Sequence, residues 1–200
     1  MNDDNSKTLK SYEEHIQDYV VGTPQAVEGD FKAWIDRALA LLPQHGTVLE
    51  LGSAFGRDAA YIKSQGFRVI ATDAVQGFVD LLQKAGHDTR LLNALTDEFG
   101  QNYNMIFANA VLLHFSPDQT KEVLQKAYRS LRPGGVLAFS VKRGSGSAWS
   151  EAKLDAPRHF YYWEHDDLEA TVKASGFDLL ELTARVGPKD KWLQVIARKS

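Results

Sequence analysis

The stretch VLELGSAFGRDAAYI, residues 48–62, decides the fold of this chain. Its apolar start predicts a buried strand, and the residues after Gly56 follow a helical pattern. Gly52 and Gly56 lie between the two, and glycines there let the backbone approach a ligand above the amide groups of a helix N-terminus. A strand, a glycine loop and a helix in this order are typical of the nucleotide site of a doubly wound α/β fold.

The glycine spacing restricts the type of ligand. The dinucleotide fingerprint is G-x-G-x-x-G, and its middle glycine allows the chain to touch a pyrophosphate. Ala54 takes that middle position here, and the pattern is G-x-x-x-G. The loop therefore favours a ligand that has an adenosine but no phosphates, and S-adenosylmethionine (SAM) is such a ligand.

An acidic residue follows the next apolar run. The second predicted strand ends at Asp73, where a carboxylate would hold the two hydroxyls of a ribose. The alternative is that Gly52 and Gly56 form only a tight turn and that Asp73 only caps a helix. The loop and the acid occur together, about one βαβ unit apart, and this combination favours an adenosyl site.

The remaining sequence alternates apolar runs with helical patterns. It predicts strands at 47–51, 68–72, 89–92, 105–109, 136–141, 177–185 and 191–198, and helices around 57–65, 75–85, 118–131 and 166–175. Alternating strands and helices indicate a parallel sheet with helices on both faces. The last two strands flank a Gly187-Pro188 turn and must pair antiparallel. We predict a Rossmann-like, doubly wound α/β fold whose mostly parallel seven-stranded sheet ends in an antiparallel hairpin.

The domain organisation follows from length and pattern. With 200 residues, the chain is expected to form one domain. Residues 1–8 are polar and predicted to be disordered, 9–45 form an N-terminal helical cap, and 46–200 form the sheet core. In the cap, Asp30 is the expected N-cap of a helix that ends before Pro43.

Composition excludes several function classes. The chain has no cysteine, which removes disulfides, thiolate nucleophiles and zinc–thiolate clusters. A net charge of −3 disfavours nucleic acid as the main partner. No apolar run is long enough to span a membrane, and the N-terminus lacks the order of a signal peptide. We expect a cytoplasmic protein, either a monomer or a homodimer, without a membrane partner.

Taken together, the motifs resemble the class I SAM-dependent methyltransferases. The resemblance covers residues 40–198 and rests on five segments: 50–56 (ELGSAFG), Asp73, 103–115 (YNMIFANAVLLHF), 131–142 (LRPGGVLAFSVK) and 160–182. That family folds as a seven-stranded sheet with a reversed final hairpin, as the strand pattern also predicts. Within the family, GRDAAYI and SVKRGSGSAW resemble most closely small bacterial enzymes of the thiopurine and tellurite methyltransferase type.

The resemblance implies a set of cofactor-binding residues: Glu50, Gly52, Ser53, Ala54, Gly56, Asp73, Ala74, Asn93, Ala94, Leu95, Asn109 and Ala110. Glu50 would support the methionine end of SAM, and Asp73 would hold the ribose. The family often has an acid after the third strand that accepts from the adenine amino group. This chain has Asn93 there, whose side-chain carbonyl would accept as a neutral group.

Methyl transfer from a sulfonium needs alignment and exclusion of water, and it needs a base only if the acceptor loses a proton. His114 follows the fourth strand and is the candidate catalytic group, although it could instead pack against the helix that begins at Ser116. Segments 12–30 and 142–163 are free to form an acceptor pocket, and the first is expected to close over the cleft as a lid that meets the second. The candidate substrate-binding residues are Tyr19, His114, Arg143, His159 and Tyr161, unless these aromatics only pack the loops onto the core.

The expected function is SAM-dependent methyl transfer to a small-molecule acceptor by in-line displacement. No metal is expected, because the fourth and fifth strands end in Asn109 and in Ser140-Val-Lys142 rather than in acids. Two alternatives remain: a SAM-fold protein that binds or senses the cofactor without methyl transfer, and a methyltransferase acting on RNA or protein. A nicotinamide-dependent oxidoreductase is disfavoured by Ala54 and by the terminal hairpin.

Overall fold

A computed structural model describes residues 3–187 and 190–200. Its helices are α1 (Asp3–Glu14), α2 (Ile16–Val21), α3 (Gly29–Leu39), α4 (Arg57–Ser64), α5 (Gln76–Lys84), α6 (Pro117–Ser130), α7 (His165–Ala174) and a 3-10 turn, η1 (Leu112–His114). Its strands are β1 (Thr47–Leu51), β2 (Arg68–Asp73), β3 (Asp88–Leu91), β4 (Tyr103–Asn109), β5 (Leu131–Arg143), β6 (Ser147–Ser150), β7 (Arg158–Trp163), β8 (Phe177–Val186) and β9 (Lys191–Lys199).

The central sheet contains the seven predicted strands in the expected arrangement. Strands β3, β2, β1, β4 and β5 lie side by side and parallel, β9 pairs antiparallel with β5, and β8 pairs antiparallel with β9. The predicted mostly parallel sheet with a terminal hairpin is confirmed. Pro188 of the predicted hairpin turn lies outside the described residues.

Two further strands enlarge the sheet to nine, which the sequence pattern did not predict. β7 pairs parallel with the end of β5 just beyond the last β4–β5 pair, Asn109–Ser140, through the pairs Lys142–Tyr162 and Arg143–Trp163, and β6 pairs antiparallel with β7. The segment RHFYYW of β7 is rich in aromatic residues, which suit a half-buried strand. Much of the segment predicted as a loop at 142–163 is therefore an extension of the sheet.

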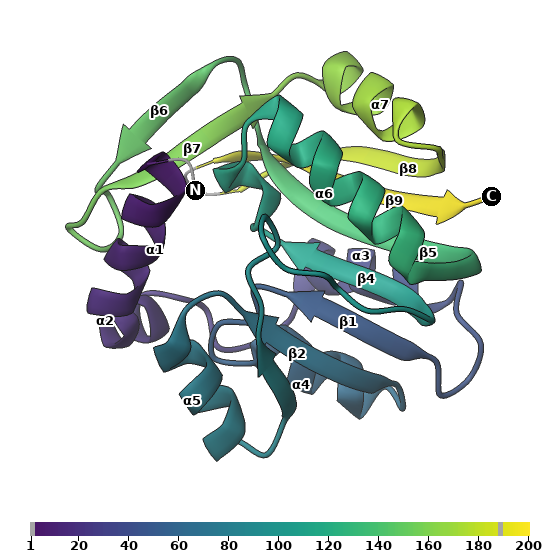
Figure 1. The fold of residues 1–200 in the computed structure, drawn as a ribbon, viewed down its shortest axis with the longest axis horizontal. Coiled ribbons are helices and arrows are strands. Elements are labelled where there is room, and N and C mark those ends of the chain that lie inside the picture. Colours follow the sequence, from purple (N-terminus) through teal and green to yellow (C-terminus); the bar gives the residue numbers. More distant parts are fainter. Residues whose placement is uncertain (1–2, 188–189) are drawn as a thin grey trace.

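Alternating side chains of the strands build the two layers of the core. Val48, Phe107 and Ala138 face α3 and α4 in one buried cluster. Their neighbours Leu49 and Phe139 face α6 and α7 in the other. The period of two along each strand sends successive side chains to opposite faces, so both faces must be covered by helices. Figure 1 shows this layered arrangement.

The N-terminus differs from the prediction. Residues 3–8, expected to be disordered, form the first half of α1. Polar side chains hold this helix on β7: Thr8 accepts a hydrogen bond from the backbone N–H of His159 (3.0 Å), and the Ser11 hydroxyl donates to the carbonyl of Pro157 (2.6 Å). A polar sequence can order when its hydroxyls satisfy backbone groups of a neighbouring strand. Asp30 is not an N-cap either, because α3 begins at Gly29 and Glu28 holds the cap position.

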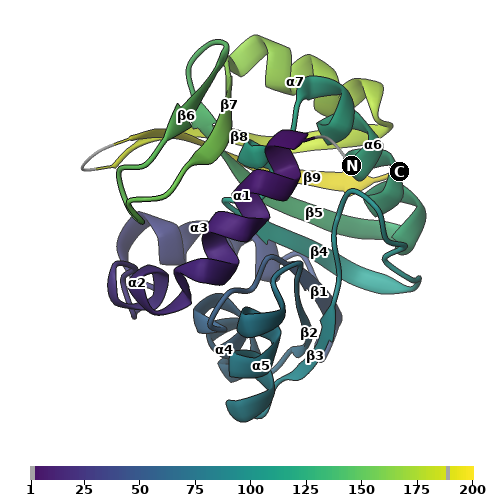
Figure 2. The ribbon, with the colours of Figure 1, turned by 60° about the vertical axis from the view of Figure 1, so that its left-hand side comes forward.

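The N-terminal helices lie at the edge of the sheet where ligands bind in such folds. The arrowheads of β1, β2 and β4 point toward the side on which α1 and α2 lie (Figure 1), and α1 crosses in front of these strand ends (Figure 2). Within the described ranges, no helix is both long and apolar enough to cross a bilayer.

Candidate active site

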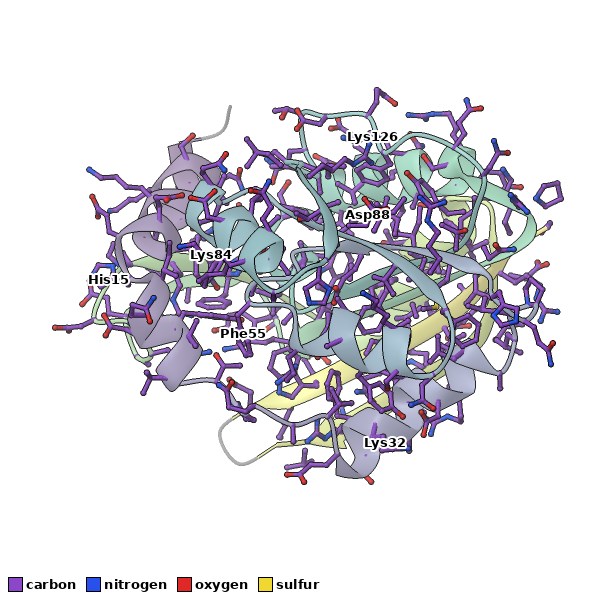
Figure 3. The ribbon with its side chains drawn as sticks, turned by 90° about the horizontal axis from the view of Figure 1, so that it is seen from below. His15, Lys32, Phe55, Lys84, Asp88 and Lys126 are labelled. Carbon is purple, nitrogen blue, oxygen red and sulfur yellow. The ribbon has the colours of Figure 1, made fainter. Side chains whose placement is uncertain are left out.

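The glycine loop after β1 has the conformation that its sequence predicts. Gly52 has φ +66° and Gly56 has φ +87°, a region that side chains disfavour. A Cβ on Gly52 would lie 2.4 Å from Cγ2 of Val111, and one on Gly56 would lie 2.8 Å from Nε2 of His87. Both positions therefore require glycine for two reasons: the positive φ angle, and the lack of space for a Cβ in the packed loop. Figure 3 shows Phe55 of this loop between the N-terminal helices and α4.

Asp73 at the end of β2 joins the two loops that surround the site. One carboxylate oxygen accepts from the N–H of Ala54 (2.9 Å) and the other from the N–H of Val75 (3.0 Å). The side chain is 7% exposed, and burial raises the pKa of Asp73 to about 6 although these hydrogen bonds act in the opposite direction. Each oxygen keeps one further acceptor position, which suits a pair of ribose hydroxyls.

A cavity of about 90 Å³ lies between this loop and the N-terminal helices. Nine of the predicted site residues line it: Tyr19, Gly52, Ala54, Asp73, Ala74, Ala94, Asn109, Ala110 and His114. Residues that the sequence analysis did not assign also line it, among them Asn5, Thr8, Tyr12, Phe78 and Val111. A pocket for a drug-sized ligand measures about 300–1,000 Å³. The cavity is therefore smaller than an adenosyl ligand needs, and we expect α1 and α2 to move outward when such a ligand binds.

A second cavity of about 350 Å³ adjoins the first. The two share Tyr19, Asn109 and Ala110, and the second is also lined by Arg57 and Ser140. Tyr19 and the end of β4 thus separate a pocket beside Asp73 from a pocket beside α4. The arrangement fits an extended ligand such as SAM, with the adenosyl end near Asp73 and the methionyl end near Asn109 and Arg57.

Asn109 is held by a chain of hydrogen bonds across the strand ends. Its side-chain N–H donates to Asp58 (3.0 Å), its carbonyl accepts from the Ser140 hydroxyl (2.7 Å), and that hydroxyl accepts from the N–H of Ala110 (3.0 Å). Asp58 also pairs with Arg57 at 2.6 Å. These contacts fix the loop after β4 between the two cavities. In the sequence, this position is marked by Asn109, the polar residue that ends an otherwise apolar strand.

Glu50 and Ser53 lie behind the loop rather than in the cavity wall. The Glu50 carboxyl is 2% exposed and accepts from the Ser53 hydroxyl at 2.7 Å. Burial, reinforced by the negative charge of Asp58, raises the pKa of Glu50 to about 8. A nearby cation, such as the ammonium group of SAM, would favour the ionised form.

Glu50 makes a pH dependence testable. Its pKa is about 8 in the folded protein against about 4.5 in the unfolded chain, so its contribution to stability is present below pH 4.5 and is lost as pH rises through 8. Glu50→Gln imitates the protonated form. We expect this variant to gain roughly 3 kcal/mol of unfolding free energy relative to the wild type between pH 5 and pH 8, measured by denaturant unfolding without ligand. Exposed Asp88→Asn is the control, and parallel pH profiles for Glu50→Gln and the wild type would contradict the assignment.

His114 lies in the cavity wall in a defined tautomer. Its Nδ1 is 2.6 Å from the carbonyl oxygen of His159 and must donate, because a carbonyl only accepts. Its Nε2 is 3.0 Å from the hydroxyl of Tyr12 and is therefore the acceptor. Burial lowers the pKa of His114 to about 4, and the positive charges of Arg158 and Lys142 act in the same direction. The ring is neutral at neutral pH, and the lone pair of Nε2 accepts the hydrogen bond from the Tyr12 hydroxyl.

The segment predicted as a lid lies over the cavity and contacts the 142–163 segment. Tyr12 and Tyr19 pack edge to face, with ring centroids 5.4 Å apart, and both line the cavity. Thr23 accepts a hydrogen bond from Lys153, whose ammonium nitrogen lies 3.7 Å from the centroid of Tyr19. The placement is the one expected, and whether the segment opens and closes remains a prediction.

Three of the predicted substrate-binding residues do not line this cavity. Arg143 lies at the end of β5 with a half-exposed side chain, 3.8 Å from Glu164. His159 and Tyr161 pack against each other on β7, with ring centroids 4.7 Å apart, and only the backbone carbonyl of His159 reaches the site through His114. His159 and Tyr161 occur in a strand that was predicted as a free loop, and alternate side chains of a strand point to opposite faces, so these two point away from the site.

The side chain of Asn93, a predicted adenine contact, is used in a local turn and does not line the cavity. The side-chain carbonyl of Asn93 accepts from the N–H of Leu95 (2.9 Å), a local turn that Asn commonly forms. Leu92 and Ala94 line the cavity instead, whereas Asn93 and Leu95 do not. Within residues 3–187 and 190–200, no three His, Asp or Glu side chains form a possible metal site. Metal independence remains a prediction.

Comparison with known proteins decides the family. The family described as "Methyltransferase domain" matches residues 25–182, which include the glycine loop, Asp73 and His114. The chain belongs to the class I SAM-dependent methyltransferase family. The chain is 28% identical to phosphoethanolamine N-methyltransferase of Plasmodium falciparum over 106 residues, and 30% identical to carboxy-S-adenosyl-L-methionine synthase of Desulfotalea psychrophila over 130 residues. Those alignments cover 50% and 56% of this chain but only 40% and 52% of the relatives.

A solved structure confirms the fold of the chain. The 1,6-didemethyltoxoflavin-N1-methyltransferase of Burkholderia thailandensis, determined with its substrate and S-adenosylhomocysteine, matches with a TM-score of 0.78. The match covers 98% of this chain and 88% of that one, at 23% identity. The N-terminal helices are therefore included in the similarity, since little of the present chain lies outside it.

Proposed function

We propose that this protein transfers the methyl group of SAM to a small-molecule acceptor. The observation that carries the proposal is the meeting of two groups in one cavity wall: the buried carboxylate of Asp73 beside the glycine loop, and the neutral imidazole of His114 paired with Tyr12. The first suits an adenosyl ligand, and the second suits an acceptor that loses a proton.

The cofactor side follows from the contacts of the loop. Asp73 accepts the ribose hydroxyls, and the backbone at Gly52 and Ala54 borders the adenosyl group without an intervening side chain. When bound, SAM supplies an electrophilic methyl group on a positively charged sulfur. The hydrogen-bonded loop at Asn109 and Ala110 then fixes the direction from which an acceptor can approach, which is the main requirement for in-line transfer.

The acceptor side follows from the tautomer of His114. Its Nε2 can take a proton from Tyr12 or from an acceptor that replaces the Tyr12 hydroxyl. Tyr12, Tyr19 and Phe78 form an aromatic cluster over the cavity, with the Tyr19 and Phe78 centroids 5.4 Å apart, and this cluster excludes water. Residues of α1 and α2 line the cavity and cover it at this point, which favours a small acceptor over RNA or a protein chain.

The relatives also support a second use of the cofactor, because one of them is named for the synthesis of carboxy-SAM. The two reactions give different products. Calorimetry with SAM, S-adenosylhomocysteine and NAD should give binding of the first two only. Mass spectrometry after incubation with candidate acceptors should then detect S-adenosylhomocysteine together with an acceptor heavier by one methylene group.

The outcomes of this experiment separate the alternatives. Absence of SAM binding would overturn the proposal. Binding of SAM without conversion of any acceptor would favour a sensing role, and a modified SAM in place of S-adenosylhomocysteine would favour the carboxy-SAM reaction. Transfer of methyl to RNA or protein, with none to small molecules, would overturn the choice of acceptor.

A further inference from the structure

A buried guanidinium lies next to the acceptor side of the cavity. Arg158 is the first residue of β7 and is 5% exposed. Its guanidinium carbon lies 5.6 Å from the ring centroid of Tyr12 and 5.3 Å from that of Phe160. The ring of His114 in turn packs on Phe160 at 4.8 Å. Arg158 is thus part of the cluster that holds the Tyr12–His114 pair.

This guanidinium lacks the partner that a buried charge normally has. Its Nε makes no hydrogen bond, and no carboxylate within the described parts of the chain lies at ion-pair distance from it. Buried Arg side chains are almost always paired, because an unpaired charge away from water is costly. Aromatic faces offset only part of this cost. The missing negative charge is therefore expected to come from a ligand.

Two other cations near the cavities, Arg57 and Lys142, differ from Arg158 because each forms an ion pair with a carboxylate. Arg57 is neutralised by Asp58 at 2.6 Å, and Lys142 by Asp190 at 3.1 Å. Lys153 has no carboxylate at ion-pair distance among the side chains that the structure describes, and it lies over the ring of Tyr19. Partial burial and the positive charges of Arg158 and Arg57 lower the pKa of Lys153 to about 8. The buried guanidinium of Arg158 and the ammonium of the solvent-exposed Lys153 side chain therefore flank the Tyr12–Tyr19 pair.

We propose that the methyl acceptor carries a compact oxyanion, a phosphate or a carboxylate, that pairs with Arg158 and is assisted by Lys153. The inference rests on the proposed function and names the class of acceptor. The cofactor has a carboxylate of its own, but the methionyl end is assigned to the cavity beside Arg57, on the other side of Tyr19. When α1 and α2 move outward to admit ligands, the face of Arg158 that Tyr12 covers becomes accessible from the acceptor side.

An oxyanion at Arg158 would also act on the base. The pKa of His114 is held down in part by the positive charge of Arg158, and a bound anion would offset that charge. The imidazole would then become a stronger proton acceptor when an acceptor of the correct charge is present. The same contact would provide both selection of the substrate and activation of the base.

The test uses the full chain saturated with S-adenosylhomocysteine, with inorganic phosphate and acetate as separate probes at constant ionic strength. We expect phosphate, acetate or both to raise the melting temperature of the wild type and to give measurable binding by calorimetry. Arg158→Met should weaken that binding at least tenfold, Arg158→Lys should retain part of it, and Lys153→Gln should weaken it by a smaller factor. Arg68→Gln, on an exposed ion pair at the start of β2, is the matched control and should respond as the wild type does.

Two further readouts separate a binding role from a structural one. Without ligand, Arg158→Met should melt at or above the wild-type temperature, because it removes an unpaired buried charge. A lower melting temperature, with unchanged anion binding in Arg158→Lys and Lys153→Gln, would overturn the proposal. So would tenfold weaker binding of S-adenosylhomocysteine in Arg158→Met, because the anion held there would then be the cofactor's carboxylate. Wild-type binding of S-adenosylhomocysteine without any response to either probe would overturn this inference and leave the proposed function standing.

Discussion

Deletion of residues 1–29 is expected to lower methyl transfer by at least about a hundredfold, while SAM binding falls by no more than about tenfold. The deletion removes Tyr12 and Tyr19, which cover the cavity and hold the partner hydroxyl of His114. It leaves the glycine loop and Asp73, which belong to the sheet core. Loss of the cover admits water and frees the acceptor from its alignment, and both effects act on the transition state more than on cofactor binding.

The measurement compares turnover and SAM affinity of the shortened chain, beginning at Asp30, with those of the full chain. Since α1 also packs on β7, the paired variant Tyr12→Phe/Tyr19→Ala provides a test that keeps the helices in place. Lys10→Ala, on the exposed side of α1, is the control. Full turnover in the shortened chain would contradict the role of a lid. Unfolding of the shortened chain together with normal turnover of the paired variant would show that α1 and α2 only pack the N-terminus onto the sheet.

Asp73→Ala is expected to weaken SAM binding by about ten- to a hundredfold, because each charge-assisted hydrogen bond to a hydroxyl contributes about 1.5–3 kcal/mol. The change also leaves the N–H groups of Ala54 and Val75 without their acceptor, so a lower melting temperature is expected as well. Calorimetry on the folded variant, below its melting transition, measures the binding effect alone. Asp88→Ala, an exposed acid paired with Arg68, is the control. Wild-type affinity in folded Asp73→Ala would place the ribose elsewhere.

Part of the site was visible in the sequence because it depends on local backbone geometry. Gly52 and Gly56 mark a loop that must adopt positive φ angles, and Asp73 marks the end of the neighbouring strand in a βαβ unit. Such features are encoded within about 25 residues, so the pattern predicts their positions. The strand alternation likewise predicted seven strands of the sheet, because the period of two records which face of a strand is buried.

The acceptor side required the tertiary structure. Tyr12 and His114 are separated by 102 residues, and they meet because Thr8 and Ser11 of α1 bond to the backbone of residues 157–159. The Thr8 hydroxyl lies in the polar stretch 1–8 that the sequence predicts to be disordered, and the segment that both hydroxyls contact was predicted as a loop. By itself, the sequence determined seven strands of the sheet, the glycine loop and the position of Asp73 beside it, because each depends on residues close along the chain. Docking of α1 on β7 decided which side chains line the proposed acceptor side of the cavity, because that contact joins distant segments through backbone groups that no residue pattern reveals.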